Sequence, residues 1–391
     1  MKKKIVFSLL DSPALGGAEQ YVFSHLRFLN NNGYGVLLAT NNQIVKSEFL
    51  KRLNSKEKQT FKITNLPYRL DAIGNLRGLI KFFLSLPKAV IWCFLILKRL
   101  RIDYDQVICL WPGFSDRLVF SPIAKFLKCK LVWIEIGPLY PVFKRNFGFP
   151  KILYFLSQKF PDYVVTISKY SMSSILRDSK IQKRKVKLVY PGIEVTRNKT
   201  RLKKKNNSSI FSVVARLAHE NEVDMVLKAF PLFLGNNKNS HLWIVGTGPQ
   251  EDELKKLAQK LGIKKHVAFF GFLSEEGKMK KIKESDFFIF PRAWSWDGFG
   301  ITTIEALSQG IPVLTSRFGP QVEIVRDGIE GFLYKPHDPL DLAKKMSTIV
   351  DLTSQERLAL SMNALRRADY FSEKKSNLQI LNLIRDLKQT I

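Results

Sequence analysis

The sequence has few residues of the kinds that build a disulfide framework or a metal centre. It contains three cysteines and five histidines in 391 residues. Cys93, Cys109 and Cys129 are odd in number, widely spaced and set among apolar residues, which predicts buried free thiols in a reducing compartment. The histidines form no cluster with metal-ligand spacing, so no metal site is expected. A small, disulfide-rich secreted domain is therefore excluded.

Long hydrophobic runs are also lacking. Three lysines precede the apolar run from Ile5 to Leu10 and imitate a signal peptide, but that run is too short and Asp11 ends it. The next candidate, Ala89 to Leu97, is bounded by basic residues and falls short of the ~20 residues that span a bilayer. We therefore expect a cytoplasmic protein without a membrane-spanning segment.

Acidic residues are scarce relative to basic ones. The chain has 34 Asp and Glu against 63 Lys and Arg, a formal net charge of +29 and a pI of about 9.9. Such an excess either reflects a Lys-rich background or indicates an anionic partner, and nucleic acid and an anionic membrane face are both candidates. Motifs typical of nucleic-acid-binding domains are missing, so no nucleic-acid partner is expected. A basic nucleic-acid-binding protein is kept as a further alternative, and peripheral contact with the inner membrane face stays open.

Length and composition predict a two-domain globular α/β protein. The chain is too long for one ordinary core, and 45% of its residues are hydrophobic while 25% are charged. Each half repeats the order of apolar strand, turn and helix that is typical of a doubly wound parallel sheet. We place an N-terminal domain at 1–190, a linker at 191–207 and a C-terminal domain at 208–372, followed by a terminal helix within 373–391.

The stretch from Phe287 to Leu314 carries the most specific chemistry. It predicts a buried strand, a glycine-containing turn, a helix over 301–309 and a second strand over 311–314. Free amides at the helix start favour an anion, which Gly298 and Gly300 allow to approach closely. Asp297 and Glu305 flank the same position, so a nucleotide sugar suits this turn better than a bare phosphate does. Taken singly, Asp297 would be a turn-former and Glu305 a solvated helix residue.

The whole string resembles the donor-site signature of the retaining glycosyltransferases of family 4, E-G-F-G-x-x-x-x-E-A-x-x-x-G-x-P-V. Residues 297–300, 305–306 and 310–313 fill this pattern in register. Asp297 stands where Glu is usual, which keeps the charge and shortens the side chain by one methylene. The Gly16-Gly17 turn before an amphipathic helix, and the order of turns in the second half, match the same family.

The resemblance implies a GT-B fold, in which two Rossmann-like doubly wound domains face each other across a cleft and the C-terminal helix crosses back to the N-terminal domain. The C-terminal domain would bind a nucleotide-diphosphate sugar, and the N-terminal domain would bind a glycan or lipid-linked acceptor of cell-surface polysaccharide synthesis. The sugar would be transferred with retention, and neither a cofactor nor a metal would be needed.

The resemblance also assigns roles to individual residues. Asp297 would orient the sugar hydroxyls, Glu305 would hold the ribose and Arg216 would pair with the phosphates, and we name these three as the catalytic set. The predicted donor-binding residues are Gly16, Gly17, Arg216, Asn221, Gly246, Gly271, Phe272, Phe299, Gly300, Ile301, Thr302 and Glu305. The predicted acceptor-side residues are Glu135, Gly137, Lys144 and Arg145.

Two positions depart from the family. Asn221 stands where a Lys is usual, and the strand end at Glu135 and Ile136 lacks the customary His. Losing one stabilising cation would cost on the order of 2–4 kcal/mol of transition-state stabilisation unless Arg292 or nearby lysines compensate. A degenerate member that binds nucleotide sugar with little or no turnover is therefore an alternative function.

Two further segments allow more than one interpretation. Residues 73–101 predict one or two helices broken near Pro87, which either pack on the sheet or lie in a lipid interface through aromatic residues such as Phe83 and Trp92. The loop from Tyr140 to Phe149 would shape an acceptor site or touch lipid. Asp103-Tyr104-Asp105 has the spacing of a metal-binding D-x-D triplet, but we interpret it as a turn between helix and strand.

Overall fold

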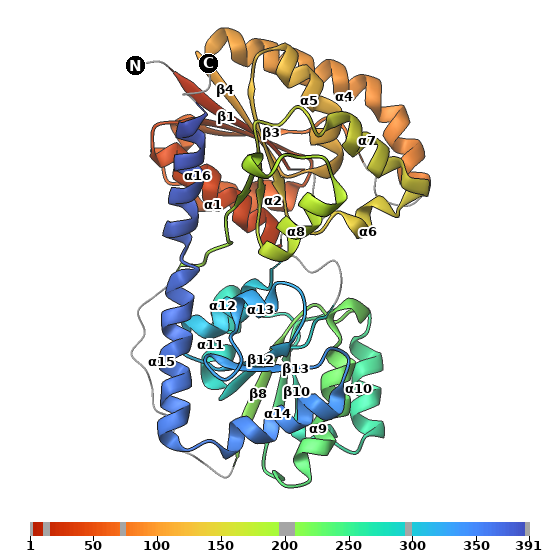
Figure 1. Ribbon diagram of the computed structural model, residues 1–391, viewed down its shortest axis with the longest axis vertical. Helices are drawn as coiled ribbons and strands as arrows, with labels where there is room; N and C mark the ends of the chain where they lie inside the picture. Colours follow the sequence, from red (N-terminus) through yellow and green to blue (C-terminus); the bar gives the residue numbers. More distant parts are fainter. Residues whose placement is uncertain (1–2, 11–15, 71–75, 195–207, 294–298, 388–391) are drawn as a thin grey trace. The chain divides into compact units, whose positions relative to one another are not determined.

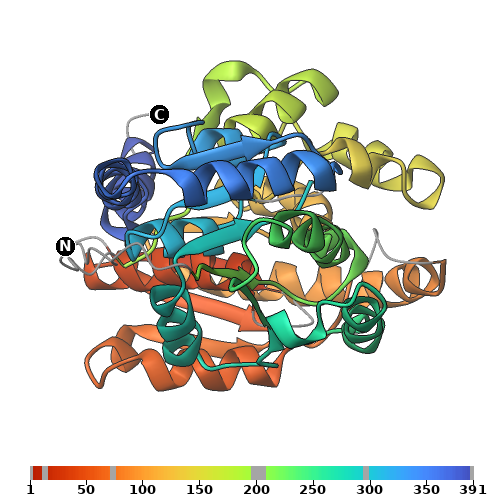
Figure 2. The same cartoon turned by 90° about the horizontal axis from the view of Figure 1, so that it is seen from below.

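A computed structural model describes residues 3–10, 16–70, 76–194, 208–293 and 299–387. The chain divides into two compact units, Met1–Pro191 with Glu373–Ile391, and Gly192–Ser372. Most of the predicted linker, together with the catalytic candidate Asp297 and its neighbour Gly298, lies outside the described residues. Helices flank a central sheet in each unit (Figure 1, Figure 2).

The N-terminal unit is built on a seven-stranded sheet in the order β3-β2-β1-β4-β5-β6-β7. All its strand pairs are parallel, and β1 and β4 are almost wholly buried, as expected for strands covered on both faces. The strands are β1 Lys4–Leu10, β2 Gly35–Thr40, β3 Phe61–Asn65, β4 Gln106–Trp111, β5 Lys130–Glu135, β6 Tyr163–Thr166 and β7 Val186–Leu188.

Helices of this unit connect the parallel strands and cover the sheet. The principal ones are α1 Gly17–Asn31, α2 Gln43–Arg52, α4 Leu76–Asp103, α5 Phe114–Phe126, α7 Phe149–Ser157 and α8 Lys169–Asp178; shorter helical turns are α3 Glu57–Thr60 and α6 Tyr140–Phe143. The three cysteines are buried free thiols in this core, as predicted.

Helix α4 corrects one prediction, because Pro87 does not break it. The helix is continuous over 28 residues with Pro87 inside. Phe82 and Ala89, on either side of the proline, are both buried, so packing holds the helix together where one backbone hydrogen bond is missing. The helix ends at Asp103 and β4 begins at Gln106, which confirms that the D-x-D triplet is a turn between helix and strand.

The C-terminal unit contains a second parallel sheet, with six strands in the order β10-β9-β8-β11-β12-β13. Its strands are β8 Ile210–Val214, β9 His241–Val245, β10 Val267–Phe269, β11 Phe287–Phe290, β12 Val313–Ser316 and β13 Gly331–Tyr334. Its helices are α9 Val223–Leu234, α10 Glu251–Lys260, α11 Glu275–Glu284, α12 Ile301–Ser308, α13 Gln321–Ile324, α14 Pro339–Asp351 and α15 Ser354–Tyr370.

The strand predicted at 311–314 begins two residues later than expected. The Ile311 amide donates to the Ala306 carbonyl at 3.1 Å and so closes the end of α12 rather than joining the sheet. Gly310, with φ of 70°, follows the end of α12 in the left-handed conformation that is typical of helix C-caps. The apolar character of Ile311 therefore reflects its burial at the helix end and not a place in the strand.

The C-terminal helix α16, Glu373–Asp386, belongs to the N-terminal unit and packs against α1. Ser24 donates to the Glu373 carboxylate, and the Ser376 hydroxyl donates to the Tyr190 carbonyl at 2.6 Å. His25 is buried at this contact, with Nδ1 2.5 Å from Asn377 Oδ1. Burial lowers the pKa of His25 to about 4, and the hydrogen bond to Asn377 offsets only part of that effect.

His25 predicts a specific loss of stability in mild acid. The unfolded chain takes up a proton near pH 6.5 while the folded chain stays neutral until about pH 4, so stability falls as the pH falls through this window. The loss reaches about 3 kcal/mol at the acid end. Urea unfolding of wild type and His25→Gln at several pH values isolates this contribution, because Gln can still donate to Asn377. Identical pH profiles for the two proteins would contradict the assignment.

Candidate functional site

The order of strands in the C-terminal sheet marks where a ligand is expected. From β8 the chain winds outward through β9 and β10, and then returns to the other side of β8 to place β11. This reversal is a topological switch point, and open α/β sheets bind ligands outside the carboxyl ends of the two strands beside it. Arg216 follows β8, and the loop that leads to α12 follows β11. Two predicted donor-binding elements therefore lie on neighbouring strands.

The loops that follow the carboxyl ends of the strands lie along one edge of the sheet, which we call the carboxyl edge. Backbone hydrogen bonds connect these loops to one another. The Leu217 amide donates to the Thr247 carbonyl at 2.9 Å, and the Gly246 amide donates to the Gly271 carbonyl at 2.8 Å. Gly246 has φ of 129°, and a Cβ there would lie 1.9 Å from the Ala215 carbonyl oxygen. The structure thus gives Gly246 a packing role, since only glycine allows the two loops to approach so closely. Its predicted contact with a donor stays a prediction.

Arg216 and Asn221 belong to one short loop after β8. The Arg216 side chain is exposed and has no hydrogen bond or ion pair among the described residues. The Asn221 side-chain amide donates to the Arg216 carbonyl at 2.7 Å and so fixes the backbone that carries the guanidinium. Asn221 therefore stabilises the backbone of Arg216, and one of its two side-chain N–H donors is already engaged.

The start of α12 is held by a buried glutamine that the sequence did not single out. Gly300 caps the helix with φ of 88°, and Ile301 and Thr302 open it. Gln321, which is wholly buried, donates to the Phe299 carbonyl at 2.9 Å and accepts from the Thr303 hydroxyl at 3.0 Å. The first amides of a helix have no acceptor within the helix, so this turn presents fixed donors at the carboxyl edge.

Glu305 projects from α12 with one carboxylate oxygen engaged and one unpaired. Lys278 of α11 donates to Oε1 at 2.9 Å, and both side chains are only 13% exposed. Oε2 is buried and has no hydrogen-bond partner among the described residues. Burial raises the pKa of Glu305, and Lys278 offsets part of that rise. A buried carboxylate oxygen without a partner is a site where a hydroxyl donor from a ligand would be stabilised.

Lys278 is a site residue that sequence reasoning missed. Burial lowers the pKa of Lys278, but the Glu305 and Glu275 carboxylates more than reverse this, so the net shift is upward and the amine stays charged. In the sequence Lys278 is one of four lysines in α11, and nothing in that pattern distinguishes it from the others. Only the packing of α11 against α12 shows which lysine reaches Glu305.

A second missed residue is Glu222, which begins α9 with φ of 50°. A non-glycine residue in this left-handed region stores strain of roughly 1–2 kcal/mol. The carboxylate is buried, and His337 Nδ1 lies 3.0 Å from Oε1. Burial raises the pKa of Glu222, and His337 lowers it in part. Glu222, with its strained backbone and its contact to His337, directly follows the loop of Arg216 and Asn221 and helps to fix the end of that loop.

Other predicted donor residues lie at carboxyl edges but are less constrained. Gly271 has φ of 64°, and Phe272 is 81% exposed after β10.

In the N-terminal unit, β1 and β4 form the corresponding switch point, and Gly16 and Gly17 stand at the start of α1 after β1. The Glu19 carboxylate already accepts from the Gly16 amide at 2.7 Å, so one free amide of this helix start is occupied.

The predicted acceptor-side residues do not form one cluster. Glu135 is buried at the end of β5, and its carboxylate lies 2.6 Å from the Arg117 guanidinium, which also donates to the Ile134 carbonyl at 2.7 Å. Burial raises the pKa of Glu135, and Arg117 opposes that rise. Gly137 is half-buried nearby, whereas Lys144 and Arg145 are exposed. Glu135 therefore has a structural partner, and an acceptor role for these four residues stays a prediction.

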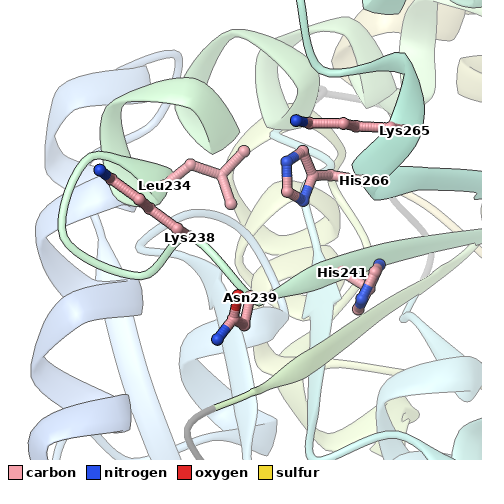
Figure 3. Close-up of a pocket in the computed structure, with 6 residues that line it drawn as sticks. All are labelled: Leu234, Lys238, Asn239, His241, Lys265 and His266. Carbon is pink, nitrogen blue, oxygen red and sulfur yellow. The ribbon is translucent and has the colours of Figure 1, made fainter.

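A shallow surface pocket of the C-terminal unit lies at the opposite end of the strands. It is lined by Leu234, Lys238, Asn239, His241, Lys265 and His266 (Figure 3). His241 is the first residue of β9, and His266 directly precedes β10. The pocket is thus at the amino edge of the sheet, away from the switch point, and the His266 ring is already 3.1 Å from the Ser240 carbonyl. It serves below as a control site.

The ion pair between Lys278 and Glu305 leads to a test of stability. Lys278→Met leaves a largely buried carboxylate without its cation, which we expect to lower the free energy of unfolding by about 2–3 kcal/mol. Adding Glu305→Gln removes the unpaired charge, so the double variant should be more stable than Lys278→Met alone. Urea unfolding of the four proteins in a double-mutant cycle measures this coupling. Additive effects of the two substitutions would contradict the pairing.

Comparison with known sequences identifies relatives of this chain. Residues 194–367 match the family of glycosyl transferases group 1. An uncharacterized glycosyltransferase of Methanocaldococcus jannaschii is 24% identical over 368 residues, which are 89% of each chain. A GDP-mannose-dependent alpha-(1-6)-phosphatidylinositol monomannoside mannosyltransferase of Mycolicibacterium smegmatis is 29% identical over 39% of this chain and 41% of its own. The chain thus spans about half the length or less of several curated relatives that it matches.

Solved structures share the architecture of the whole chain. Anabaena HepE in complex with UDP and glucose superposes with a TM-score of 0.77 at 18% sequence identity, covering 98% of this chain and 100% of that one. At this level of identity the likeness establishes the fold.

Proposed function

We propose that the chain is a group 1 glycosyl transferase that transfers a sugar from a nucleotide-diphosphate sugar to a glycan or lipid-linked acceptor. The match of residues 194–367 to that family and the fold shared with solved glycosyltransferases support this proposal. We further propose that the transfer retains the anomeric configuration and needs no metal. The unpaired, buried Oε2 of Glu305 beside the start of α12 carries this proposal.

Each part of the carboxyl edge suits one part of such a donor. Glu305 Oε2 accepts from a ribose hydroxyl while Lys278 keeps the carboxylate charged and in place. The amides of Ile301 and Thr302 and the Arg216 guanidinium face the negative charge of the diphosphate. Asp297, which lies outside the described residues, keeps its predicted role of orienting the sugar hydroxyls.

The chemical step follows from these roles. The bond between the anomeric carbon and the diphosphate oxygen breaks, and the acceptor hydroxyl oxygen forms a new bond to that carbon on the same face. The acceptor proton moves to the departing phosphate oxygen, so no separate base is required. Charge accumulates on the diphosphate as the bond breaks, and Arg216 with the helix amides stabilises that charge where a metal ion would otherwise be needed.

A relative supports a membrane-linked acceptor. The mycobacterial relative is named for a phosphatidylinositol mannoside acceptor. We place the protein in the cytoplasm with peripheral contact to the inner membrane face, where lipid-linked acceptors are found. The net charge of +29 supports attraction to an anionic surface.

A thermal stability screen tests donor binding. One nucleotide-diphosphate sugar from a panel of UDP and GDP sugars should raise the melting temperature by a few degrees, because a ligand at a hundred times its Kd stabilises the folded state by about 2.7 kcal/mol. Glu305→Gln should remove most of this rise, since an amide cannot replace the charged acceptor.

The amino-edge pocket supplies the matched control for that screen. His241→Gln changes a residue of that pocket and should leave the ligand-induced rise intact. A wild-type protein that no nucleotide stabilises, or an equal loss in Glu305→Gln and His241→Gln, would refute donor binding at the carboxyl edge.

Asn221 favours one second candidate, a protein that binds nucleotide sugar without turning it over. Its side chain is a neutral amide, one N–H of which already donates to the Arg216 carbonyl, so it adds no charge toward a leaving diphosphate. Asn221→Lys separates the two functions. In an active enzyme the variant loses a hydrogen bond worth about 1 kcal/mol, and kcat/KM should fall roughly fivefold.

In a protein without turnover the same variant gains a cation at the leaving group, and transfer or donor hydrolysis should appear where wild type has none. Released nucleoside diphosphate measures both cases. We expect the fall, since Arg216 and the α12 amides already face the diphosphate in the proposal. Turnover in the variant where wild type has none would favour the non-catalytic candidate.

A further inference from the structure

Helix α4 is apolar on the face that it turns to solvent as well as on the face that it buries. Its buried residues are Phe82, Ala89, Cys93, Leu97 and Leu100. On the opposite side Ile80, Leu84, Ile91, Leu95 and Ile102 recur at intervals of four and seven and are 55–77% exposed. Since a helix turns 100° per residue, these five form one outward stripe along the whole helix. An ordinary surface helix carries polar residues there.

The charged residues along α4 are all basic until its last residue. Arg77, Lys81, Lys88 and Lys98 are exposed beside the stripe, and no acidic residue precedes Asp103. An apolar stripe with a cationic border and no anions is complementary to a bilayer with acidic headgroups, where lysine stems lie along the apolar part and the amines reach the phosphates.

Helix α7 and the loop before it repeat this pattern. Ile152 and Leu156 are 59% and 64% exposed at i and i+4, and no acidic residue occurs between 136 and 161. Phe147, at the tip of the loop, is 98% exposed. Its φ of 56° lies in the left-handed region, which is unfavourable for a bulky side chain. The loop therefore holds a phenylalanine in full contact with solvent at a cost in backbone strain.

The start of α7 is in contact with α4. The Phe149 ring, at the start of α7, lies 5.7 Å from the Phe82 ring and 5.4 Å from the Phe83 ring of α4. Figure 1 shows α4, in orange, along the outer edge of the N-terminal unit, with α5 and α7 beside it. We call the exposed apolar residues of α4 and α7, with Phe147, the apolar face.

Helix α4 is long and apolar enough to cross a bilayer by length and composition, since an 18-residue window within Arg77–Asp103 has a mean hydropathy of 1.9 and only 17% of that window is buried. Its connections exclude this orientation. The helix links β3 to β4, two parallel strands of the same sheet, and its buried side packs into the core of that sheet. A crossover helix cannot leave its sheet to span lipid, so the outward stripe can meet only the surface of a membrane.

We propose that the apolar face is an interfacial membrane-docking surface, on which α4 and α7 lie in the plane of an anionic bilayer with Phe147 inserted among the acyl chains. This docking surface would bring the enzyme to a lipid-linked acceptor. The docking proposal rests on the proposed function only for the identity of that acceptor. Burial of such a face reaches about 5–10 Å below the headgroups.

Vesicle co-sedimentation of the full chain tests the docking surface. Wild type should bind phosphatidylcholine vesicles containing roughly a third phosphatidylglycerol, and bind pure phosphatidylcholine at least about tenfold more weakly. Leu84→Ser/Ile91→Ser/Leu95→Ser should lower the affinity by at least about tenfold, because three apolar side chains no longer enter lipid. Leu232→Ser/Leu340→Ser, at exposed leucines of the C-terminal unit, is the matched control and should bind as wild type does.

Phe147→Gly is a second variant that should weaken membrane binding without impairing folding. Glycine relieves the left-handed strain, so the melting temperature should stay the same or rise while vesicle affinity falls several-fold. Lys81→Ala/Lys88→Ala should weaken binding to anionic vesicles and flatten its salt dependence, whereas Lys256→Ala/Lys260→Ala on the C-terminal unit should not.

Three outcomes would overturn the proposal. In the first, wild type does not bind anionic vesicles. In the second, the triple variant binds them as well as wild type does. In the third, neither protein binds vesicles, and wild type is a dimer in the absence of lipid whereas the triple variant is a monomer. The last result would assign the apolar face to a second copy of the chain. Nucleotide-induced melting shifts, measured on the same proteins, should be unchanged by all variants, so failure of docking is distinguishable from failure of donor binding.

Discussion

Parallel strand pairing is the constraint on which the rest of the structure depends. It sends every strand of a sheet toward the same edge, so that the turns of distant segments meet there. In the C-terminal unit this brings Arg216 and the start of α12 to adjacent strands at the switch point between β8 and β11. Backbone bonds between loops, such as that from Gly246 to Gly271, then fix the edge before any ligand arrives. The buried Gln321 does the same for the turn that carries Gly300.

Sequence patterns predicted most strands and the αβ class because strands buried on both faces are continuous apolar runs. The patterns failed where backbone bonds decide the outcome. Ile311 is apolar but closes a helix, and Pro87 lies inside a helix because its neighbours are buried. For the candidate site, the resemblance to a donor-site family named Glu305 and Arg216, but Lys278, Gln321 and Glu222 take their places through packing between helices or through strained backbone. One lysine among several in α11 carries no local signal that it will pair with Glu305.

The two units combine different kinds of surface. The C-terminal edge is a polar site in which charges are paired or held by the backbone, as with Glu305 and Lys278. The apolar face of the N-terminal unit exposes hydrophobic residues, and the charged residues along α4 are basic up to Asp103 at its end. A net charge of +29 is explained in part by those basic residues, and a peripheral enzyme acting on a lipid-linked acceptor needs both surfaces.

Amide hydrogen exchange with and without a saturating nucleotide sugar would test the central claim most directly. The account predicts slower exchange on donor binding in peptides that cover residues 215–222 and 299–308, where Arg216 and the α12 amides meet the diphosphate. Peptides that cover 238–241 and 265–266, at the amino edge, should be unchanged. Protection confined to the amino edge, or none at 299–308 when binding is saturated, would contradict the assignment of the donor site to the carboxyl edge.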